Sequence, residues 1–514
     1  ALVHNGIIEN YGGLRERLKG EGHTFKSDTD TEVIAHLIEK HYKDGLAQAV
    51  RAALKELEGA YAIVVVCTKE PDILVAARCG SPLIFGIGKG ENLVASDVPA
   101  ILRYTRNVIY LRDEQVIQVE RDGYRVTDLD GNVVKMPVAT IEWDVSGSEK
   151  AGYDHFMLKE IHEQPDALRN TLRGRVSEGS ADVNLEGMNL TDEELRAAGK
   201  FVVICCGTAW HAGLTGRYFI ERFTRTPVEV DLSSEFRYRD PLVGPDSIII
   251  AVSQSGETAD TLAGIREAKA RGAKVVSIVN VVGSSVARES DGLIYTQAGP
   301  EIGVASTKAY TAQMMSFWLF TIYLGRLKGT INGDDARAMI AQLRAIPDKI
   351  QRVLDDQSAI LRCADKYHTA ANFLFLSRSY NFPNALEGAL KLKEISYIHA
   401  EGHGAGEMKH GPIALVDESF PVVCIAPRGH VYDKMVSNIQ EIKARKGIII
   451  SVATEGDEEI KKHSDEVIYV PDCPEAFSPL VAAVPMQLLA YHIAVRRGCD
   501  VDQPRNLAKS VTVE

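Results

Sequence analysis

The feature that most constrains the fold is a series of short, uniformly apolar runs that alternate with helical segments in the C-terminal two thirds of the chain. Three such runs are Phe201–Cys206, Ser247–Val252 and Lys274–Val279, with helical periodicity between them at Gly213–Phe223 and Thr258–Arg271. A strand that is apolar on both faces must be covered on both, as in a parallel sheet flanked by helices. We therefore predict an α/β domain here.

The same order of elements recurs further along the chain, and the helix-to-strand phrases that begin at Ile265 and Ile439 are alike. Such a repeat predicts two copies of one flavodoxin-like unit, offset by the distance between these two isoleucines. The second copy comprises Asn372–Leu376, the helix Ala385–Ile398, Pro421–Ala426, the helix Lys434–Arg445 and Gly447–Val452.

Residues 1 to about 145 follow a different pattern. Predicted helices at Thr31–Tyr42 and Gly45–Leu57 stand among short β-rich runs, which indicates a mixed α+β domain. The polar stretch Asp144–Asp154 is predicted to be a linker, and the amphipathic segment Phe156–Leu172 to be a helix that leads onward. The predicted strands are Tyr61–Cys67, Ile73–Ala77, Asn107–Leu111 and Gln115–Glu120.

A loop rich in small hydroxyl residues, Ser253-Gln-Ser-Gly-Glu-Thr258, follows the second apolar run of the first copy. At the carboxyl end of a parallel strand, such residues and the backbone N–H groups converge on an anion, and the next helix dipole adds favourable charge. One Ser here would more often only cap the helix, but several donors in six residues favour a ligand. We predict a phosphate cradle. The second copy has Ala426-Pro-Arg-Gly429 in the same place and lacks it.

Two other sets of polar residues have open interpretations. Gly207-Thr208 and Ser306-Thr307-Lys308 fit helix capping and ligand contact about equally. Glu387, Lys391 and Glu394 share one side of a predicted helix, and such pairs are usually solvated, so the local interpretation is an exposed surface.

The glycine-rich segment His399–Pro412 is predicted to be a loop suited to acid/base chemistry, because it is dense in titratable side chains. Lys509 lies in the aperiodic tail Asp502–Glu514, and by itself is interpreted as a disordered surface lysine. Asn5-Gly6 fits a turn better than an oxyanion hole, and Asp30 fits a helix N-cap. The titratable residues of the loop are Glu401, His403, Glu407, Lys409 and His410.

Charge and composition exclude several classes of function. The net charge of −12 argues against nucleic acid or an anionic membrane as the main partner. The eight cysteines lack metal-ligand spacing and are predicted to be free thiols in a reducing cytoplasm. The most apolar helix candidate, Met314–Leu327, is too short and too interrupted to span a bilayer, and no signal peptide is visible.

Together these segments resemble the glutamine–fructose-6-phosphate aminotransferase (isomerizing) family over essentially the whole chain. The segments that resemble its glutaminase part are His4–Asn10, Ser27–His36, Ser81-Pro-Leu83 and Ala95–Asp97. Those that resemble its sugar-isomerase part are Ser253–Thr261, Glu301–Lys308, Glu387–Tyr397 and Asp502–Glu514.

The resemblance implies an α/β protein with tandem flavodoxin-like sugar-isomerase (SIS) domains, preceded by a partial α+β N-terminal-nucleophile glutamine amidotransferase domain. The family forms glucosamine-6-phosphate from fructose-6-phosphate with glutamine-derived ammonia, the first step towards UDP-N-acetylglucosamine. The implied partners are fructose-6-phosphate, glutamine or ammonia, and a second copy in a cytoplasmic homodimer, with no cofactor or metal. The expected boundaries are 1–145 for the amidotransferase domain, 146–194 for the linker and connecting helix, 195–335 and 360–500 for the SIS domains, and 501–514 for a catalytic tail.

Residue roles follow from the resemblance alone. Lys509 is implied to form a Schiff base with the C2 carbonyl of fructose-6-phosphate, which requires a neutral amine. Glu394 is implied to move a proton between C1 and C2 with help from Lys391, and His410 to open the sugar ring from the neighbouring subunit. The implied contacts of the sugar phosphate and hydroxyls are Thr208, Ser253, Gln254, Ser255, Thr258, Val304, Ala305 and Ser306. In the glutaminase part, Asn5 and Gly6 would form the oxyanion hole and Asp30 would bind the amino group of glutamine.

Two departures from the family matter. Ala209 follows Thr208 where the family often has Ser, so one sugar contact is expected to be missing. The chain begins at Ala1 without an initiator Met, so we expect residues upstream, including the nucleophilic Cys and the Arg that holds the glutamine carboxylate. As given, the chain is expected to bind and isomerise fructose-6-phosphate, or to use free ammonia weakly, without hydrolysing glutamine.

Two other functions remain open. A deglycase or isomerase with SIS domains would use no glutamine, and would not carry residues 1–145. A non-catalytic sensor of aminosugar phosphates would keep the Ser253–Thr258 loop, but would have no use for Glu394, His410 and Lys509 together.

Overall fold

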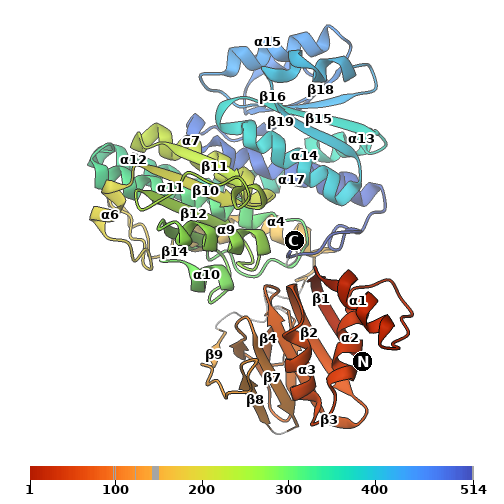
Figure 1. The fold of residues 1–514 in the computed structure, drawn as a ribbon. Helices are drawn as coiled ribbons and strands as arrows, with labels where there is room; N and C mark the ends of the chain where they lie inside the picture. Colours follow the sequence, from red (N-terminus) through yellow and green to blue (C-terminus); the bar gives the residue numbers. More distant parts are fainter. Residues whose placement is uncertain (97, 99, 103, 122, 142–149, 512–514) are drawn as a thin grey trace. The chain divides into compact units, whose positions relative to one another are not determined.

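The computed structural model describes residues 1–141 and 150–511, except residues 97, 99, 103 and 122. The chain divides into two compact units, an N-terminal unit formed mainly by the described residues up to 141 and a C-terminal unit formed mainly by those from 150 onward (Figure 1). Each unit has a hydrophobic core of its own. Residues 144–149 of the predicted linker lie outside the described residues.

The N-terminal unit holds two antiparallel sheets, in the orders β1-β2-β3-β7-β8 and β5-β4-β6-β9. The apolar sides of α2 and α3 pack onto the first sheet, which confirms the predicted α+β class. The helix α1 was missed, because only Leu14 and Leu18 of it are buried and its first turn carries two glycines. The elements are β1 Leu2–Ile8, α1 Tyr11–Gly20, α2 Thr31–His41, α3 Leu46–Leu54, β2 Gly59–Cys67, β3 Glu70–Cys79, β4 Ile84–Ile87, β5 Asn92–Ala95, β6 Asn107–Tyr110, β7 Gln115–Glu120, β8 Gly123–Thr127 and β9 Ala139–Thr140.

The C-terminal unit holds two parallel five-stranded sheets, in the orders β11-β10-β12-β13-β14 and β16-β15-β17-β18-β19. Counted from the first strand of each copy, both orders are 2-1-3-4-5, which is the flavodoxin-like order. The predicted repeat is therefore confirmed. The strands are β10 Lys200–Cys205, β11 Val228–Leu232, β12 Ser247–Ser253, β13 Lys274–Val279, β14 Gly292–Tyr295, β15 Asn372–Ser377, β16 His399–Gly404, β17 Pro421–Ala426, β18 Ile448–Thr454 and β19 Glu466–Val470.

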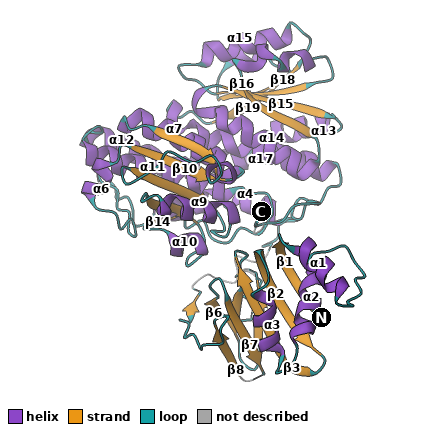
Figure 2. Ribbon diagram, viewed as in Figure 1, coloured by secondary structure: helices purple, strands orange, loops and turns teal. Residues whose placement is uncertain are grey.

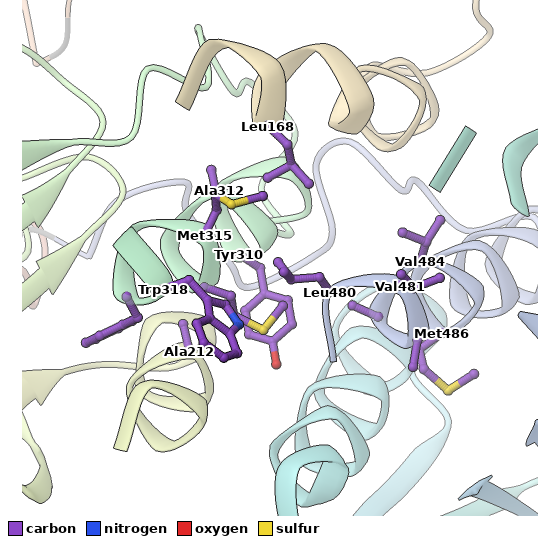
Figure 3. Close-up of a cluster of buried hydrophobic side chains, with 14 of the residues drawn as sticks. Leu168, Ala212, Tyr310, Ala312, Met315, Trp318, Leu480, Val481, Val484 and Met486 are labelled. Atoms are coloured by element: carbon purple, nitrogen blue, oxygen red, sulfur yellow. The ribbon is translucent and has the colours of Figure 1, made fainter. Parts of the chain in front are cut away.

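Helices cover both faces of each parallel sheet (Figure 2). The long helices α11 and α17 lie in a core shared by the two copies, where side chains from α5, α7, α11 and α17 meet (Figure 3). Trp318 of α11 stacks on Phe477 at a ring-centroid distance of 4.2 Å, and on Phe219 of α7 at 4.4 Å. The helices of this unit are α4 Phe156–His162, α5 Gln164–Leu172, α6 Asp192–Ala197, α7 Thr208–Thr224, α8 Ser233–Phe236, α9 Ala259–Ala270, α10 Ser285–Glu289, α11 Lys308–Lys328, α12 Gly333–Asp355, α13 Ser358–Tyr367, α14 Phe382–Ser396, α15 Tyr432–Lys443, α16 Glu458–Lys461 and α17 Ser478–Arg496.

Two predictions of local structure in this unit were wrong. The segment Phe156–Leu172 is two helices, because Pro165 begins a new helix instead of continuing one. His399–Gly404 is not a loop but the edge strand β16, which pairs in parallel with β15. Its glycine content reflects packing, since a Cβ at Gly402 would lie 2.6 Å from the carbonyl oxygen of Ala385 in α14.

The long apolar helices of this chain are buried inside the protein. Within the described residues one helical stretch, Glu475–Arg496, is long and apolar enough to cross a membrane, but 89% of its most apolar window is buried inside the protein. The helix α11 also runs beyond the predicted Met314–Leu327 and is buried along most of its length. All eight cysteines are free, as predicted.

Candidate active site

The predicted phosphate cradle lies where a ligand is expected in a flavodoxin-like sheet. The neighbouring strands β10 and β12 are the point at which the strand order reverses, and they end beside Gly207 and at Ser253. Within the loop, Gly256 N–H donates to Ser253 Oγ at 2.9 Å, and Gly256 O accepts from Val286 N–H at 2.9 Å. Gly256 has a φ of +66°, and a Cβ there would lie 2.0 Å from Ser284 Oγ, so only glycine fits this tight turn.

A buried ionic cluster joins the two copies of the repeat. Lys391 of α14 donates to Glu394 Oε2 at 2.6 Å and to Thr208 Oγ1 of α7 at 3.0 Å. Thr208 in turn donates to Glu387 Oε1 at 3.0 Å, and Glu387 Oε2 lies 2.7 Å from His211 Nδ1. The side chains of Lys391 and Glu387 are 1% and 2% exposed. The expected exposed surface was therefore wrong, because α14 packs against α7 of the other copy.

Opposing effects set the charge of Lys391. Burial lowers its pKa, but the negative charges of Glu387 and Glu394 outweigh burial and raise the pKa well above its usual value. The charge of Glu301 adds to the same effect. Lys391 is thus held as an ammonium between two carboxylates. Of these two, Glu394 is the more accessible, since its side chain is 22% exposed.

The C-terminal tail is tied down where it leaves α17. The Asp502 carboxylate accepts from the N–H groups of Phe156 and Met157, both at 2.9 Å, and so caps the first turn of α4. The backbone oxygen of Asp502 accepts from Val304 N–H at 3.0 Å. These bonds fix the tail against the segment that precedes α11.

Lys509 is anchored by the same segment. Its Nζ donates to Glu301 Oε2 at 2.9 Å and to Gly303 O at 2.8 Å, and its side chain is 19% exposed. The interpretation as a disordered surface lysine was wrong. Glu301 is fully buried, and its Oε1 accepts from Thr307 N–H at 2.8 Å and Ala309 N–H at 3.1 Å. The charge of Lys509 and these bonds outweigh burial and lower the pKa of Glu301 to about 2.

A second buried carboxyl group supports this segment. Glu160 of α4 is 2% exposed, and its Oε1 accepts from Ile302 N–H at 2.5 Å and Gly303 N–H at 3.2 Å. Its Oε2 has no hydrogen-bond partner among the described residues. Burial and the charge of Glu301 raise the pKa of Glu160 to about 8.

The segment expected to contact the sugar phosphate is organised by these carboxyl groups. Ser306 Oγ donates to Glu301 Oε2 at 3.0 Å. Thr307 is the N-cap residue of α11, but its side chain makes no capping hydrogen bond. The carboxylate of Glu301 takes over the capping of α11. Val304 and Ser306 are partly exposed, whereas Ala305 is buried.

His410 forms no hydrogen bond or ion pair with the ionic cluster among the described contacts. It is exposed at the end of the turn Glu407–His410, and it is not among the described partners of Lys391 or Lys509. In β16, His403 Nε2 lies 3.1 Å from Glu401 Oε2. The acid/base residues predicted together are therefore divided between a strand edge and an exposed turn.

Within the N-terminal unit, Asn5 and Gly6 lie inside β1, so the predicted turn was wrong. Asn5 Nδ2 donates to Ser96 Oγ at 3.1 Å. Asp30 does cap α2, as predicted, by accepting from Thr31 N–H at 2.8 Å, and it also accepts from Ile8 N–H at 2.9 Å. One carboxylate therefore ties the helix start to the strand.

Gly6 is required by close packing. Its φ is +140°, and a Cβ would lie 2.0 Å from the carbonyl oxygen of Ala60 in β2. We expect Gly6→Ala to destabilise the N-terminal unit by about 3 kcal/mol, from overpacking and backbone strain. Urea unfolding measures this. Gly12→Ala, in α1 with nothing within 4 Å of the added Cβ, is the control and is expected to be neutral or stabilising; equal effects of both changes would contradict the argument.

Potential metal ligands also lie together in the N-terminal unit. The Nδ1 atoms of His23 and His36 are 3.1 Å apart, and each is 3.5 Å from Glu39 Oε2. These three side chains therefore bring their nitrogen and oxygen atoms within 4.8 Å of one another.

Comparison with known proteins identifies the family of this chain. Residues 194–323 and 366–497 match the SIS domain model, and residues 1–103 match the glutamine amidotransferase domain model. A glutamine–fructose-6-phosphate aminotransferase (isomerizing) of Thermus thermophilus is 52% identical over 514 residues, covering 100% of this chain and 84% of the relative. The enzyme of the same name from Chlorobaculum tepidum is 51% identical over 518 residues, with the same coverage of both chains. The chain belongs to the glutamine–fructose-6-phosphate aminotransferase (isomerizing) family.

Solved structures agree with this family. The C-terminal domain of glucosamine-fructose-6-phosphate aminotransferase from Francisella tularensis is 39% identical, with a TM-score of 0.65, and matches 69% of this chain and all of that one. A glucosamine-6-phosphate deaminase from Thermotoga maritima, 22% identical with a TM-score of 0.54, covers 70% of this chain and all of that one, and shares the fold.

Three site residues of this aminotransferase-family chain were not singled out from the sequence. His211 and Glu160 stand on amphipathic helices, where nothing local distinguishes them from other polar residues. Glu301 lies within the segment Glu301–Lys308 that resembles the family, but its sequence position does not show that it caps α11, because it stands seven residues before the helix begins.

Glu160 makes stability depend on pH. Because its folded pKa of about 8 exceeds the usual 4.5, the folded state keeps a proton that the unfolded state loses, so stability falls as pH rises from about 4.5 to 8. Glu160→Gln removes this titration. The free energy of unfolding of the variant relative to the parent is expected to be higher at pH 8 than at pH 5, by on the order of 3 kcal/mol. Urea unfolding at both pH values measures it. The exposed Glu178→Gln is the control, and a pH-independent difference for Glu160→Gln would contradict a neutral Glu160.

Proposed function

We propose that this chain forms glucosamine-6-phosphate from fructose-6-phosphate, with ammonia drawn from glutamine. The observation that carries the proposal is the buried Lys391 cluster, built from both SIS copies beside a second anchored lysine, Lys509. Burying several charges is costly unless they serve chemistry or specificity. A sensor that only binds a sugar phosphate would need the cradle alone.

The substrate is proposed to bind with its phosphate at the turn after β12 and its reacting carbons between Lys391 and Lys509. Lys509 forms the Schiff base with C2. Glu394 moves the proton between C1 and C2, because it is the accessible carboxylate on Lys391, whereas Glu387 is enclosed by Thr208 and His211. The proposed contacts of the phosphate and hydroxyls are Thr208, Ser253, Gln254, Ser255, Thr258, Val304, Ala305 and Ser306.

His410 is proposed to open the ring of the sugar that is bound to a second copy of the chain. Its exposure on the surface of this chain supports a role in a neighbouring subunit of a homodimer. In the N-terminal unit, Asn5 and Gly6 are proposed to stabilise the oxyanion formed from glutamine, and Asp30 to bind its amino group. We place this activity in the cytoplasm. The proposed boundaries are 1–145 for the amidotransferase domain, 146–194 for the linker and connecting helix, 195–335 and 360–500 for the SIS domains, and 501–514 for the catalytic tail.

The test is an assay with two nitrogen donors. The protein is incubated with fructose-6-phosphate and either ammonium or glutamine, and glucosamine-6-phosphate is measured by mass spectrometry, while calorimetry measures sugar binding. Product with ammonium supports the sugar-isomerase half on its own. Binding of fructose-6-phosphate with no product from either donor would instead support a sensor, and no binding would overturn the proposal.

A further inference from the structure

Lys509 has a docking site of its own before any substrate is present. Its Nζ is shared between Glu301 Oε2 and Gly303 O, and Glu301 has no other cation among its described hydrogen-bond partners. The amine that must become a nucleophile is therefore in direct contact with a fully buried carboxylate before the sugar binds. Resting on the proposed function, we infer that Glu301 is a catalytic residue that takes a proton from Lys509 and later returns it, and that Glu160 is the positioning residue that holds this pair in place.

Glu301 can exchange a proton without moving. Three of its four hydrogen bonds come from the backbone and hydroxyl groups of Thr307, Ala309 and Ser306, at 2.8, 3.1 and 3.0 Å. These bonds fix the carboxylate at the start of α11, so losing Lys509 to the substrate leaves it in the same position. Fixed geometry favours proton transfer. Burial by itself raises the pKa of Glu301, and the charge and hydrogen bond of Lys509 are the main effects that lower it, so the carboxylate becomes a better proton acceptor as the amine loses its charge.

Glu160 supports the other half of the docking site. It accepts from the N–H groups of Ile302 and Gly303, and the carbonyl of Gly303 is the second acceptor of Lys509. Its unpartnered, buried Oε2 fits a protonated carboxyl group, since an ionised oxygen without a donor would be costly to bury. A neutral Glu160 leaves Glu301 as the one negative charge that faces Lys509 among the described contacts of the docking site.

Burial and the charge of Glu301 favour the neutral form of Glu160, and the charges of Lys509 and Lys308 oppose it with a smaller effect. Glu301 and Lys509 face it across the segment before α11, and Lys308 faces it from α11 itself. Lys308 is already neutralised by Glu163, at 2.6 Å, which Lys159 of α4 also approaches at 3.4 Å. Lys308 and Lys509, the two cations near Glu160, are therefore already paired with other carboxylates, those of Glu163 and Glu301.

The proposed step balances without a further reactant. Glu301 takes one proton from the Lys509 ammonium, and the neutral amine attacks C2 of the ketose, forming the C–N bond as the C=O π bond opens. A proton moves from the nitrogen to the new oxygen to give a neutral carbinolamine. Glu301 then returns its proton to the hydroxyl, the C–O bond breaks, water leaves and the protonated Schiff base remains.

The experiment measures how fast fructose-6-phosphate becomes trapped on Lys509 by borohydride between pH 6 and 9.5, with mass spectrometry as the readout and calorimetry for sugar binding. Glu301→Gln is expected to bind the sugar within about threefold of the parent, but to form the adduct at least about 100-fold more slowly near pH 7. The deficit should shrink towards pH 9.5, where hydroxide can deprotonate the amine. Glu160→Ala removes the acceptor of the Ile302 and Gly303 N–H groups and is expected to slow trapping at pH 7, whereas Glu160→Gln, which keeps an acceptor oxygen there, is expected to restore most of the lost rate.

Two further variants make the result decisive. Glu178→Gln removes an exposed carboxylate that does not contact Lys509, Glu301 or Glu160, and is expected to trap at nearly the parent rate. Glu301→Asp keeps the charge on a shorter side chain and replaces Glu301→Gln if that variant does not fold, with an intermediate rate expected. Trapping by a folded Glu301 variant at the parent rate across the whole pH range would overturn the inference. Failure of the parent itself to be trapped would overturn the proposed function instead.

Discussion

Lys509→Met is expected to lose the borohydride-trapped adduct completely and to form glucosamine-6-phosphate at least about 1000-fold more slowly than the parent. Methionine has a similar length and no amine, so it removes the proposed nucleophile while keeping most of the side-chain volume. Because the tail is also fixed by Asp502 through the first turn of α4, the variant is expected to stay folded. Mass spectrometry of the trapped protein and of the product measures both effects.

The matched control for this change is Lys150→Met. Lys150 is 46% exposed and approaches the tail at Asp502, at 3.8 Å, without contacting Glu301. It is expected to leave trapping unchanged. An adduct of full yield in Lys509→Met would show that another amine carries the sugar.

Lys391→Met is expected to destabilise the C-terminal unit by about 3–5 kcal/mol, and to stop isomerisation as well. The change leaves the buried carboxylate of Glu387 without its cation and removes a donor to Thr208. The loss is expected near the lower end of this range, because Thr208 and His211 remain as hydrogen-bond partners of Glu387. Urea unfolding followed by tryptophan fluorescence reports on this unit through Trp318.

A double-mutant cycle tests the cause of that loss. Adding Glu387→Gln to Lys391→Met removes the uncompensated charge, and is expected to restore a large part of the lost stability. Lys393→Met, an exposed position on the same helix, should change stability by less than about 0.5 kcal/mol. If the double variant is no more stable than Lys391→Met, lost packing and not charge is responsible.

The repeated strands could be predicted from the sequence because their signal is local. The runs at Lys274–Val279 and Pro421–Ala426 coincide with β13 and β17, since strands buried on both faces are apolar at most positions. The edge strand β16 could not be predicted in this way. Its side chains are only partly buried, and its Gly402 is dictated by α14, so its composition is typical of a loop.

The site was harder to predict, because its residues depend on distant partners. Whether Glu387 and Lys391 are exposed depends on Thr208 and His211, which are almost 180 residues earlier in the chain. The same holds for Lys509, whose environment is set by Glu301. Helical spacing placed Glu387, Lys391 and Glu394 on one side correctly, but it contains no information on what covers that side.

The hydrogen bond from Thr208 to Glu387 has an evolutionary consequence. After the duplication that the repeat records, the two copies came to differ: the first has the hydroxyl-rich turn Ser253–Thr258, and the second has Lys391 and its carboxylates. Neither copy can then change its sequence independently, because a substitution on α7 changes which side chains are tolerated at the contacting positions of α14. We expect paired changes at positions 208, 211 and 387 among distant relatives, and inactive chimaeras when one half is exchanged without the other.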